Sequence, residues 1–488
     1  MEIPLRLDPK LDRSLQAQIF EQIRFMILNG HLKPGMILPA SRSLSERYEI
    51  SRNTVTIAYD RLFAEGYLES RGTAGTFVSS TLPDDLILVR GERSHSNGPL
   101  PDKETGEPLL CFAGSPGGSN ERPRYDFWVG RSDPESFPSK VWRRIINKRV
   151  LHGASQLTDY SDPAGIPSLR EIIAEHLGRA RGMSVTHDQI IVTSGGQDAL
   201  NLIHQLVSNE ISGLSIENPC YLGAALIFNS TGRPVTPVDV DEAGIVVDNL
   251  PRAQGNLLYV TPSHQFPTGV LMSLNRRLAL LRWAEETKSF IVEDDYDSDF
   301  RYDGPPLTAL AGLDRCRRVF YVGTFSKSVG AGLRIGYAAV PRLYWDRARL
   351  LKAQMSNGQP WLEQAALEDF LREGHFERHL RKLRVLYKAR RDCLVSELRA
   401  NFDNPAISGD DSGLHFIWRL PPGFPPARSI QVAARSRGVG VYALSSGAAF
   451  NFDNDAADDV LVLGYSSLTE ERIRAAVRVL ASVVQSLS

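Results

Sequence analysis

Within residues 1–79, apolar side chains recur at helical spacing. One set recurs at four-residue steps and consists of Ile19, Ile23 and Ile27. A second set follows i, i+3, i+4, i+7 spacing and consists of Val55, Ala58, Tyr59 and Leu62. Such apolar faces pack against one another in small helical domains. The Gly-rich stretch from Arg71 to Thr76 then separates two short apolar runs, which predicts a tight β-hairpin.

Beyond about residue 150, short apolar runs alternate with helix-length segments such as Leu274 to Lys288. The runs begin at Ile190, Leu214, Leu257, Phe290 and Val319. This alternation predicts an α/β domain with a mostly parallel sheet covered by helices. A charged amphipathic stretch from Leu362 to about Leu398 is expected to be one solvated helix leading to a small C-terminal α+β subdomain, with a second DNA-facing surface as the alternative.

Between these two regions, residues 80–124 are rich in Pro, Gly, Ser and charge, as expected of a linker. The predicted domains are therefore 1–79, the linker 80–124, and 125–488. Within 125–488, the large part spans about 150–360 and the C-terminal subdomain about 375–488.

Composition narrows the class of protein. The 488 residues are 42% hydrophobic and 23% charged with a net charge of −1, which is ordinary for a globular protein and gives no long-range attraction to polyanions. The four cysteines show no metal-ligand or paired spacing, so no metal site is predicted. Without a signal peptide or a stretch of eighteen apolar residues, a soluble cytoplasmic protein is expected, away from membranes.

The candidate chemistry centres on Lys327 and Asp294, which both follow apolar runs. Pyridoxal phosphate needs an amine for a Schiff base and a carboxylate at its ring nitrogen. Tyr296, two residues after Asp294, would point the same way in an extended chain. Taken singly, a lysine at a turn or an acidic strand end is usually only a solvated surface feature.

Groups for a phosphate come from three separate places. Ser194, Gly195, Gly196 and Gln197 lie between an apolar run and a predicted helix, where backbone N–H groups bind anions. Arg334 would add a charge-assisted contact and Thr324 a hydroxyl. All these elements follow apolar runs, and ligands bind at that edge of open α/β sheets. Together they predict a pyridoxal 5'-phosphate site.

At these residues the chain resembles the fold-type I aminotransferase superfamily, over roughly Tyr125 to Ser488. The resemblance implies that Lys327 holds the cofactor as an internal aldimine, that Asp294 pairs with the pyridine nitrogen and that Tyr296 contacts the phenolic oxygen. Another implication is that Tyr221 stacks on the ring. Ordinary half-buried packing is the alternative for that tyrosine.

In the superfamily, the residue matching Tyr160 reaches the phosphate of the partner subunit, with packing again the alternative role. The resemblance therefore implies a homodimer, compatible with a domain-swapped, head-to-tail arrangement.

The N-terminal region resembles the GntR-type winged helix-turn-helix. The matching stretches are Leu38-Pro39-Ala40-Ser41-Arg42, Ile50 to Val55, and Leu62 to Leu68. Contacts with double-stranded operator DNA are implied for Arg42, Ser51, Arg52, Asn53, Arg71 and Gly72. Ser51 is also a good N-cap for a recognition helix. Because residues 1–80 hold ten Lys and Arg against nine Asp and Glu, only these local groups argue for DNA, and a helical bundle for protein contacts is the alternative.

The combination of the two regions resembles the MocR subfamily of bacterial transcriptional regulators. That likeness implies a regulator that senses an amine or amino-acid effector, or pyridoxal phosphate itself, through its cofactor site. The alternatives are an active aminotransferase with an accessory DNA-binding-like domain, and a cofactor-free scaffold.

Two departures from aminotransferases argue against efficient turnover, leaving at most weak or half-reaction transamination. The stretch Val460 to Ser466 lacks the arginine expected to bind a substrate carboxylate. Arg419, Arg435 or Arg437 could replace it; position 223, where related sensors carry an arginine, is glycine. Phe266 stands where aminotransferases have asparagine, and His264 is either its replacement or a structural histidine.

Overall fold

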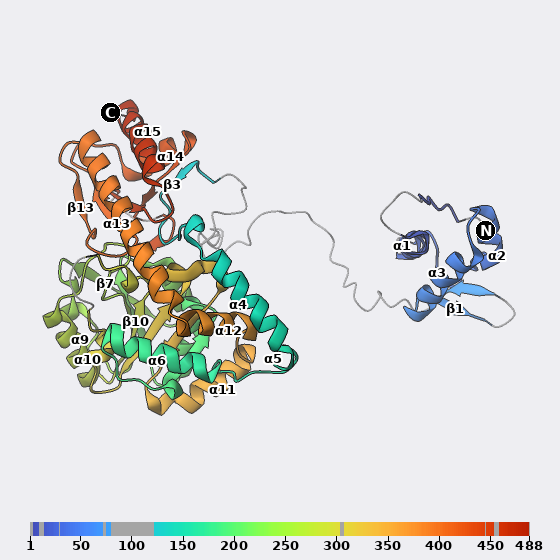
Figure 1. Cartoon of the computed structure of the whole chain (residues 1–488), viewed down its shortest axis with the longest axis horizontal. Helices are drawn as coiled ribbons and strands as arrows, with labels where there is room; N and C mark the ends of the chain where they lie inside the picture. Colours follow the sequence, from blue (N-terminus) through green and yellow to red (C-terminus); the bar gives the residue numbers. More distant parts are fainter. Residues whose placement is uncertain are drawn as a thin grey trace. The chain divides into compact units, whose positions relative to one another are not determined.

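The computed structural model describes residues 3–8, 14–28, 30–71, 75–79, 122–302, 307–444, 446–452 and 458–487. The chain forms two compact units, Met1–Leu109 and Leu110–Ser488, each shown in Figure 1. The predicted linker lies outside the described residues except for its last three, 122–124.

The N-terminal unit contains three helices and a hairpin: α1 (Leu15–Leu28), α2 (Ser41–Arg47), α3 (Arg52–Ala64), β1 (Leu68–Ser70) and β2 (Thr76–Val78). Both predicted apolar sets are buried in one core, and β1 pairs antiparallel with β2. The Ser51 side chain accepts a hydrogen bond from the Asn53 N–H at 3.2 Å, so it caps α3 as expected. This is the predicted winged helix-turn-helix.

The second unit is built on an eight-stranded sheet with the order β4-β12-β11-β10-β9-β5-β7-β8. Its strands are β4 (Ile190–Thr193), β5 (Gly213–Asn218), β7 (Val235–Asp241), β8 (Gly244–Ile245), β9 (Asn256–Val260), β10 (Phe290–Asp295), β11 (Val319–Thr324) and β12 (Gly336–Ala339). Only β12 and β8 run against the others. The mostly parallel α/β prediction is confirmed, and the carboxyl ends of β10 and β11 lie side by side.

Helices surround this sheet, as Figure 1 shows. They are α4 (Ser139–His152), α5 (Ala154–Thr158), α6 (Pro167–Arg181), α7 (Gly196–Val207), α8 (Leu222–Asn229), α9 (Leu274–Glu286), α10 (Leu310–Leu313) and α11 (Trp345–Ser356). Helix α7 follows β4 directly and packs against the central strands, so its N-terminus lies at the same sheet edge as the ends of β10 and β11.

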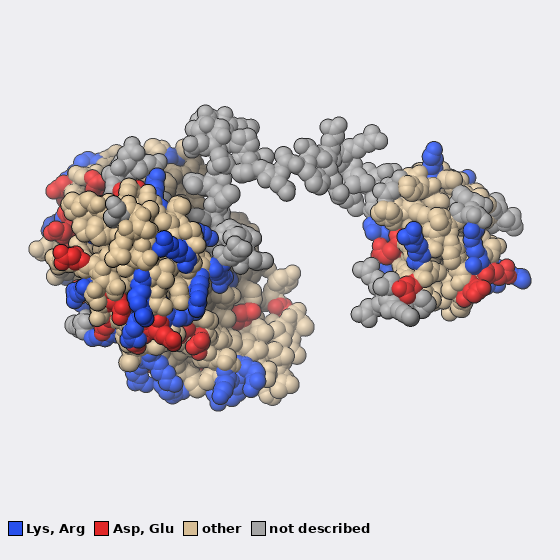
Figure 2. Space-filling view, turned by 90° about the horizontal axis from the view of Figure 1, so that it is seen from above, with Lys and Arg blue, Asp and Glu red and all other residues tan. Residues whose placement is uncertain are grey.

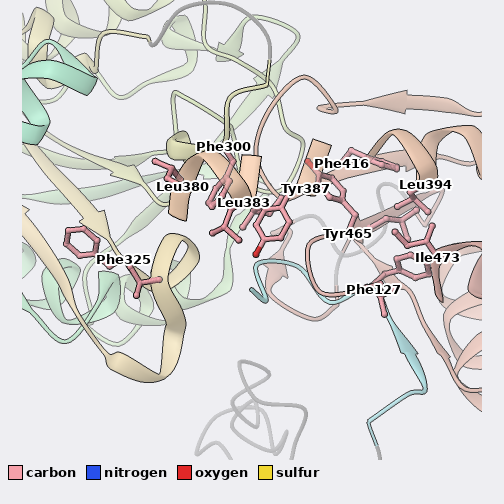
Figure 3. Close-up of a cluster of buried hydrophobic side chains, with 14 of the residues drawn as sticks. Phe127, Phe300, Phe325, Leu380, Leu383, Tyr387, Leu394, Phe416, Tyr465 and Ile473 are labelled. Atoms are coloured by element: carbon pink, nitrogen blue, oxygen red, sulfur yellow. The ribbon is translucent and has the colours of Figure 1, made fainter. Parts of the chain in front are cut away.

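The single helix expected from Leu362 to Leu398 is wrong in two respects. There are two helices, α12 (Trp361–Arg372) and α13 (His375–Asn401), because Gly374 adopts a left-handed φ of 67° between them. Helix α13 is also not simply solvated: it buries Leu380, Leu383, Tyr387 and Leu394, which form a row between Phe325 and Ile473 in Figure 3. This row joins the core of the large part to that of the C-terminal subdomain.

The C-terminal subdomain is an α+β structure, as predicted. Its antiparallel sheet has the order β13-β14-β18-β16, and its helices are α14 (Ala427–Ser436) and α15 (Glu470–Leu487). The strands are β13 (Ala406–Ser408), β14 (His415–Arg419), β16 (Tyr442–Ala443) and β18 (Val460–Gly464). Two further pairs tie in distant segments: β3 (Tyr125–Asp126) with β15 (Val439–Gly440), and β6 (Cys220–Tyr221) with β17 (Ala449–Phe450).

Among the described residues, no helix has the length and apolar character needed to cross a membrane.

Candidate functional site

Lys327 lies in a π-helical turn, Ser326–Gly330, that directly follows β11. Its Nζ donates a hydrogen bond to the carbonyl oxygen of Gly130 at 2.8 Å. Burial lowers the pKa of this amine, Asp297 and Asp294 oppose that shift, and Arg334 adds to it. A lowered pKa increases the fraction of neutral amine, which is the nucleophilic form.

Asp294 is buried near the end of β10, where its Oδ2 accepts a hydrogen bond from the Tyr259 hydroxyl at 2.8 Å. Burial raises the pKa of the Asp294 carboxyl to about 7, although Tyr259 and Lys327 both act to lower it. A cation placed beside this carboxylate would relieve the cost of its burial. The position is therefore suited to a protonated ring nitrogen.

Tyr296 and His264 form a second buried polar group beside Asp294. The Tyr296 hydroxyl donates to the His264 carbonyl oxygen at 3.0 Å and lies 3.1 Å from His264 Nδ1. His264 Nδ1 is 2.8 Å from Asp297 Oδ2. Burial alone would lower the pKa of His264, but the Asp297 carboxylate outweighs it and the net shift is upward. His264 thus lies against the hydroxyl predicted to face the phenolic oxygen.

A phosphate-sized cradle lies between Gly195 and Arg334. Gly195 precedes the first residue of α7 and has a φ of 98°, a backbone conformation that favours glycine. A Cβ at Gly195 would lie 3.2 Å from Arg334 Nη2, so the guanidinium passes directly over this turn. A helix N-terminus with a facing arginine is a ready anion site.

The two hydroxyls predicted beside the cradle have partners within the protein. Ser194 Oγ donates to Gln359 Oε1 at 2.5 Å. Thr324 Oγ1 donates to Ser326 Oγ at 2.9 Å and accepts from the Ser326 N–H at 3.1 Å, which stabilises the turn that carries Lys327. Each would have to exchange a partner to bind a ligand.

Gly223 explains where the Tyr221 ring lies. A Cβ at Gly223 would come within 2.5 Å of the Tyr221 ring and within 2.7 Å of Gln197 Nε2. Both side chains therefore fold over the bare glycine, and the Tyr221 ring also meets the edge of Phe266 with ring centroids 5.9 Å apart. An arginine at position 223 would displace them, so this position has a packing reason to be glycine.

None of the three replacement arginines is placed at Lys327. Arg419 pairs with Asp459 at 2.9 Å, Arg437 donates to the Ser482 and Ser486 hydroxyls, and Arg435 is exposed on α14. After β18, the stretch without arginine continues into Tyr465, which is buried and donates to the Gly413 carbonyl at 2.8 Å. Tyr160 lies away from the buried groups, with 87% of its surface exposed.

Sequence reasoning missed the segment that holds Lys327 from outside the sheet. Besides the Gly130 carbonyl, Ser132 Oγ donates to the Lys327 carbonyl oxygen at 3.0 Å. This segment follows β3 and is joined to the C-terminal subdomain, because the Gly464 N–H donates to Phe127 O at 2.9 Å. The contacts span nearly two hundred residues of sequence, and no local motif points to them.

The candidate DNA-contacting residues that the structure describes all belong to the N-terminal unit. Ser51, Arg52 and Asn53 are exposed at the start of α3. Arg42 pairs with Glu46 at 2.9 Å and Arg71 with Glu69 at 2.6 Å. Figure 2 shows both signs of charge on the visible face of this unit, in keeping with its near-neutral balance. Gly72 lies outside the described residues.

Comparison with known families matches both units. The family of bacterial regulatory proteins named gntR matches residues 15–78, and aminotransferase class I and II matches residues 128–445. Over 487 residues the chain is 34% identical to the probable rhizopine catabolism regulatory protein MocR of Rhizobium meliloti, covering 99% of this chain and 96% of that protein. The chain belongs to the MocR subfamily of GntR-type regulators.

A second MocR-type relative is the pyridoxine biosynthesis transcriptional regulator PdxR of Corynebacterium glutamicum. It is 33% identical over 478 residues, which cover 97% of this chain and 96% of the relative. Among solved structures, the kynurenine aminotransferase of Pyrococcus horikoshii, crystallised with PMP, has a TM-score of 0.68 at 26% identity. The match covers 75% of this chain and 92% of the enzyme. This MocR-type protein is therefore a transcriptional regulator whose GntR domain implies DNA binding.

Its aminotransferase class I and II domain indicates pyridoxal phosphate as the cofactor. The buried groups fit that molecule chemically. Lys327 supplies an amine with a lowered pKa, Asp294 a buried carboxylate without a full cationic partner, and the turn at Gly195 with Arg334 an anion cradle.

Proposed function

We propose that this regulator binds operator DNA through its N-terminal unit and responds to a small amine, an amino acid or pyridoxal phosphate itself at Lys327. The observation that carries the proposal is the presence of an amine, a buried carboxylate and an anion cradle in a chain whose last subdomain strand, β18, ends without an arginine. Such a site can hold a cofactor and admit an amine, while it lacks the usual anchor for an aminotransferase substrate.

When bound, pyridoxal phosphate supplies an aldehyde that an amine can capture. The chain itself supplies the amine of Lys327, which competes with an effector amine for that aldehyde. Lys327 is held by the Gly130 carbonyl, and its own carbonyl oxygen accepts from Ser132. Capture of the Lys327 amine by the cofactor would break its contact with Gly130, and an effector that takes the place of Lys327 would free the amine to restore that contact.

The segment that contains Gly130 is joined directly to the C-terminal subdomain. Ser466 Oγ donates to the Arg131 carbonyl oxygen at 2.6 Å, and the Tyr442 hydroxyl donates to Asp126 Oδ1 at 2.6 Å. We infer that a change at Lys327 reaches this subdomain through these bonds. An effector shifts the arrangement only if it binds one arrangement more tightly than the other.

On the DNA side, the exposed start of α3 is proposed to enter the major groove with Arg52 and Asn53 toward the bases. Arg42 and Arg71 are proposed to contact phosphates, together with Ser51 and Gly72. The pairs that Arg42 and Arg71 make with glutamates are exposed and hence weak, so phosphates can displace them at little cost.

A homodimer is part of the proposal. Tyr160 is 87% exposed, and the nearby helix residue Leu151 is 77% exposed. Exposed aromatic and apolar side chains of this size favour burial against another surface. A partner subunit would cover them and bring each Tyr160 to the phosphate of the other cofactor.

The effector is tested with purified full-length protein and a panel of amines. Absorbance between about 300 and 500 nm and binding to promoter DNA are recorded in parallel, with and without added pyridoxal phosphate. A spectral shift with one amine that also changes DNA binding, without release of a keto acid, supports an amine sensor. A change in DNA binding when the cofactor alone is added supports sensing of the cofactor. The PdxR relative, named as a regulator of pyridoxine biosynthesis, makes this outcome worth testing.

An active aminotransferase is the second candidate, favoured by the same amine, carboxylate and anion cradle and by the likeness to a kynurenine aminotransferase. Keto-acid release over many turnovers would establish it and refute the sensor.

A further inference from the structure

A polar cavity of about 130 Å³ lies beside His264 and Asp297. Separate parts of the unit supply its walls: the end of α6, the loop after β9, the segment after β10, helix α13 and the loop before β14. The polar side chains that matter here are Arg181, Ser263, Ser298, Arg301, Arg384 and Ser412. The cavity shares no residue with the cradle formed by Gly195 and Arg334.

Among the described residues, Arg181 has a carboxylate partner, whereas no ion pair is found for Arg301 or Arg384. Its Nε lies 2.7 Å from Asp295 Oδ2, and its terminal nitrogens donate to Ser263 Oγ and the Leu307 carbonyl oxygen. Asp295 and Asp297 are therefore already paired with Arg181 and His264.

Arg384 and Arg301 are not neutralised in this way. Arg384 Nε donates to the backbone oxygen of Asp299 at 2.6 Å, and Arg384 makes no ion pair within the described part of the chain. Arg301 Nε is buried and has no hydrogen-bond partner in the part of the chain that the structure describes. The one further carboxylate in the cavity wall, Asp299, is 3.9 Å from His176 Nε2. The cavity therefore carries more guanidinium charge than carboxylate charge, and a buried donor left unpaired is costly.

The cavity also adjoins Tyr296, which belongs to the proposed cofactor site. A smaller void of about 20 Å³ is lined by Arg181, Asp297 and Ser298, as the cavity is, and in addition by Tyr296 and Thr324. Asp297 holds His264, and His264 Nδ1 lies 3.1 Å from the Tyr296 hydroxyl. A molecule bound between Arg301 and Arg384 would therefore act on the group that orients Tyr296.

We propose that this cavity is a second ligand site for a small oxyanion, a phosphate or a carboxylate group, and that its occupancy alters the cofactor site. Planar guanidinium groups bind such oxyanions with paired, charge-assisted hydrogen bonds, and the serine hydroxyls add neutral donors. The volume is sufficient for a phosphate ion or a small carboxylic acid.

Calorimetric titration of the full-length protein tests the site. Inorganic phosphate and acetate are titrated separately at constant ionic strength into cofactor-saturated protein, in which pyridoxal phosphate occupies the Arg334 cradle. The Arg334→Gln variant, which loses that cradle, should keep the binding. The anion that binds more tightly identifies the chemical source.

Two variants and a matched control locate the anion. Arg384→Gln and Arg301→Gln should each weaken saturable binding by about tenfold or more, since each removes a charge-assisted contact. Arg419→Gln, at an exposed ion pair in the C-terminal subdomain, should leave it unchanged. Absence of saturable binding, or equal affinity in all variants, would overturn the site.

The link to the cofactor is measured on the same samples. The bound anion should shift the cofactor absorbance band in the wild type and in Arg419→Gln, and not in Arg384→Gln at the same anion concentration. Anion binding with an unchanged spectrum would refute the coupling.

Discussion

The cofactor site and the DNA-facing surface use charge in opposite ways. Asp294 is 7% exposed and Lys327 is half-buried, so the charge state of each depends on what lies against it. On the N-terminal unit, the side chains of Arg42 and Glu46 are 77% and 65% exposed. Buried charges are costly when they lose a partner, whereas exposed pairs contribute little and exchange freely.

This difference separates the two kinds of variant. Substitutions at the buried site should strongly change cofactor binding and reactivity and should not change DNA affinity. Substitutions at the exposed surface should weaken DNA binding moderately and in a salt-dependent way, and should not change cofactor binding. Each prediction below tests one side of that separation.

The largest effect is expected from Lys327→Ala. Without the amine, attachment of the cofactor that survives borohydride reduction and any amine response should both be lost. Operator affinity should stay within about twofold, because the DNA-binding unit is separate. Absorbance and fluorescence anisotropy measure the two effects, with the exposed Lys140→Ala as control. Loss of DNA affinity in Lys327→Ala would break the separation.

Asp294→Asn should weaken cofactor binding by about a hundredfold, since a buried cationic ring nitrogen would lose its counter-charge. Titration of cofactor fluorescence into the apo-protein gives the affinity. Asp241→Asn, at an exposed pair with Arg276, is the control and should match the wild type. Unchanged affinity in Asp294→Asn would show that the carboxylate does not face the ring nitrogen.

Arg52→Ala should weaken operator binding by about tenfold while the cofactor spectrum stays the same. Arg61→Gln on the same helix is the matched control, because Arg61 pairs with Glu65 rather than lying at the start of α3. Anisotropy at several salt concentrations should also show a shallower salt dependence for Arg52→Ala if Arg52 meets a phosphate. If the two variants bind the operator with equal affinity, the start of α3 is not the recognition surface.

Gly223→Ala should lower cofactor affinity several-fold and stability by about 1–3 kcal/mol, because the new methyl group overlaps the Tyr221 ring. Thermal melts and cofactor titration measure both quantities. Gly178→Ala on α6 is a suitable comparison, since its added Cβ meets nothing closer than 3.6 Å. A fully stable Gly223→Ala that binds the cofactor normally would contradict the packing at Tyr221.

The smallest effect concerns pH. The Asp294 pKa is about 7 in the folded, cofactor-free chain against an ordinary value of 3.8, so the folded state holds this proton more tightly than the unfolded state. Stability from Asp294 is therefore full below about pH 4 and is lost as pH rises toward 7. Between pH 5 and 8, the wild-type melting temperature should fall by a few degrees relative to Asp294→Asn. If the melting temperatures of the two proteins change with pH in parallel, the Asp294 carboxyl does not cause the effect. Glu217, whose pKa is also raised to about 7 by burial, is present in both proteins and does not affect the comparison.

Local pattern and sheet geometry together predicted which groups share one edge of the sheet. Lys327 and Gly195 come just after β11 and β4, Asp294 lies near the end of β10, and strand ends of a parallel sheet share an edge. The break at Gly374 was missed because charged helical periodicity continues on both sides of it. Gly130, Asp297 and His415, whose ring centroid lies 4.8 Å from that of His264, were missed for another reason.

These three residues enter the site through long-range packing. His264, Asp297 and His415 bring their side-chain nitrogen or oxygen atoms within 4.8 Å of one another, from three separate parts of the sequence. The Gly130 contact uses a backbone oxygen, which leaves no trace in residue type. Only the folded arrangement reveals such partners.

The short strand β3 gives the regulator a mechanical property. Tyr125 and Asp126 pair with Val439 and Gly440, and the same segment continues to the Gly130 carbonyl that holds Lys327. Residues 122–124 lead into this strand, so a force on the strand would be passed to the lysine amine through residues 127–130. Pulling on β3 and filling the site would thus act on the same short segment.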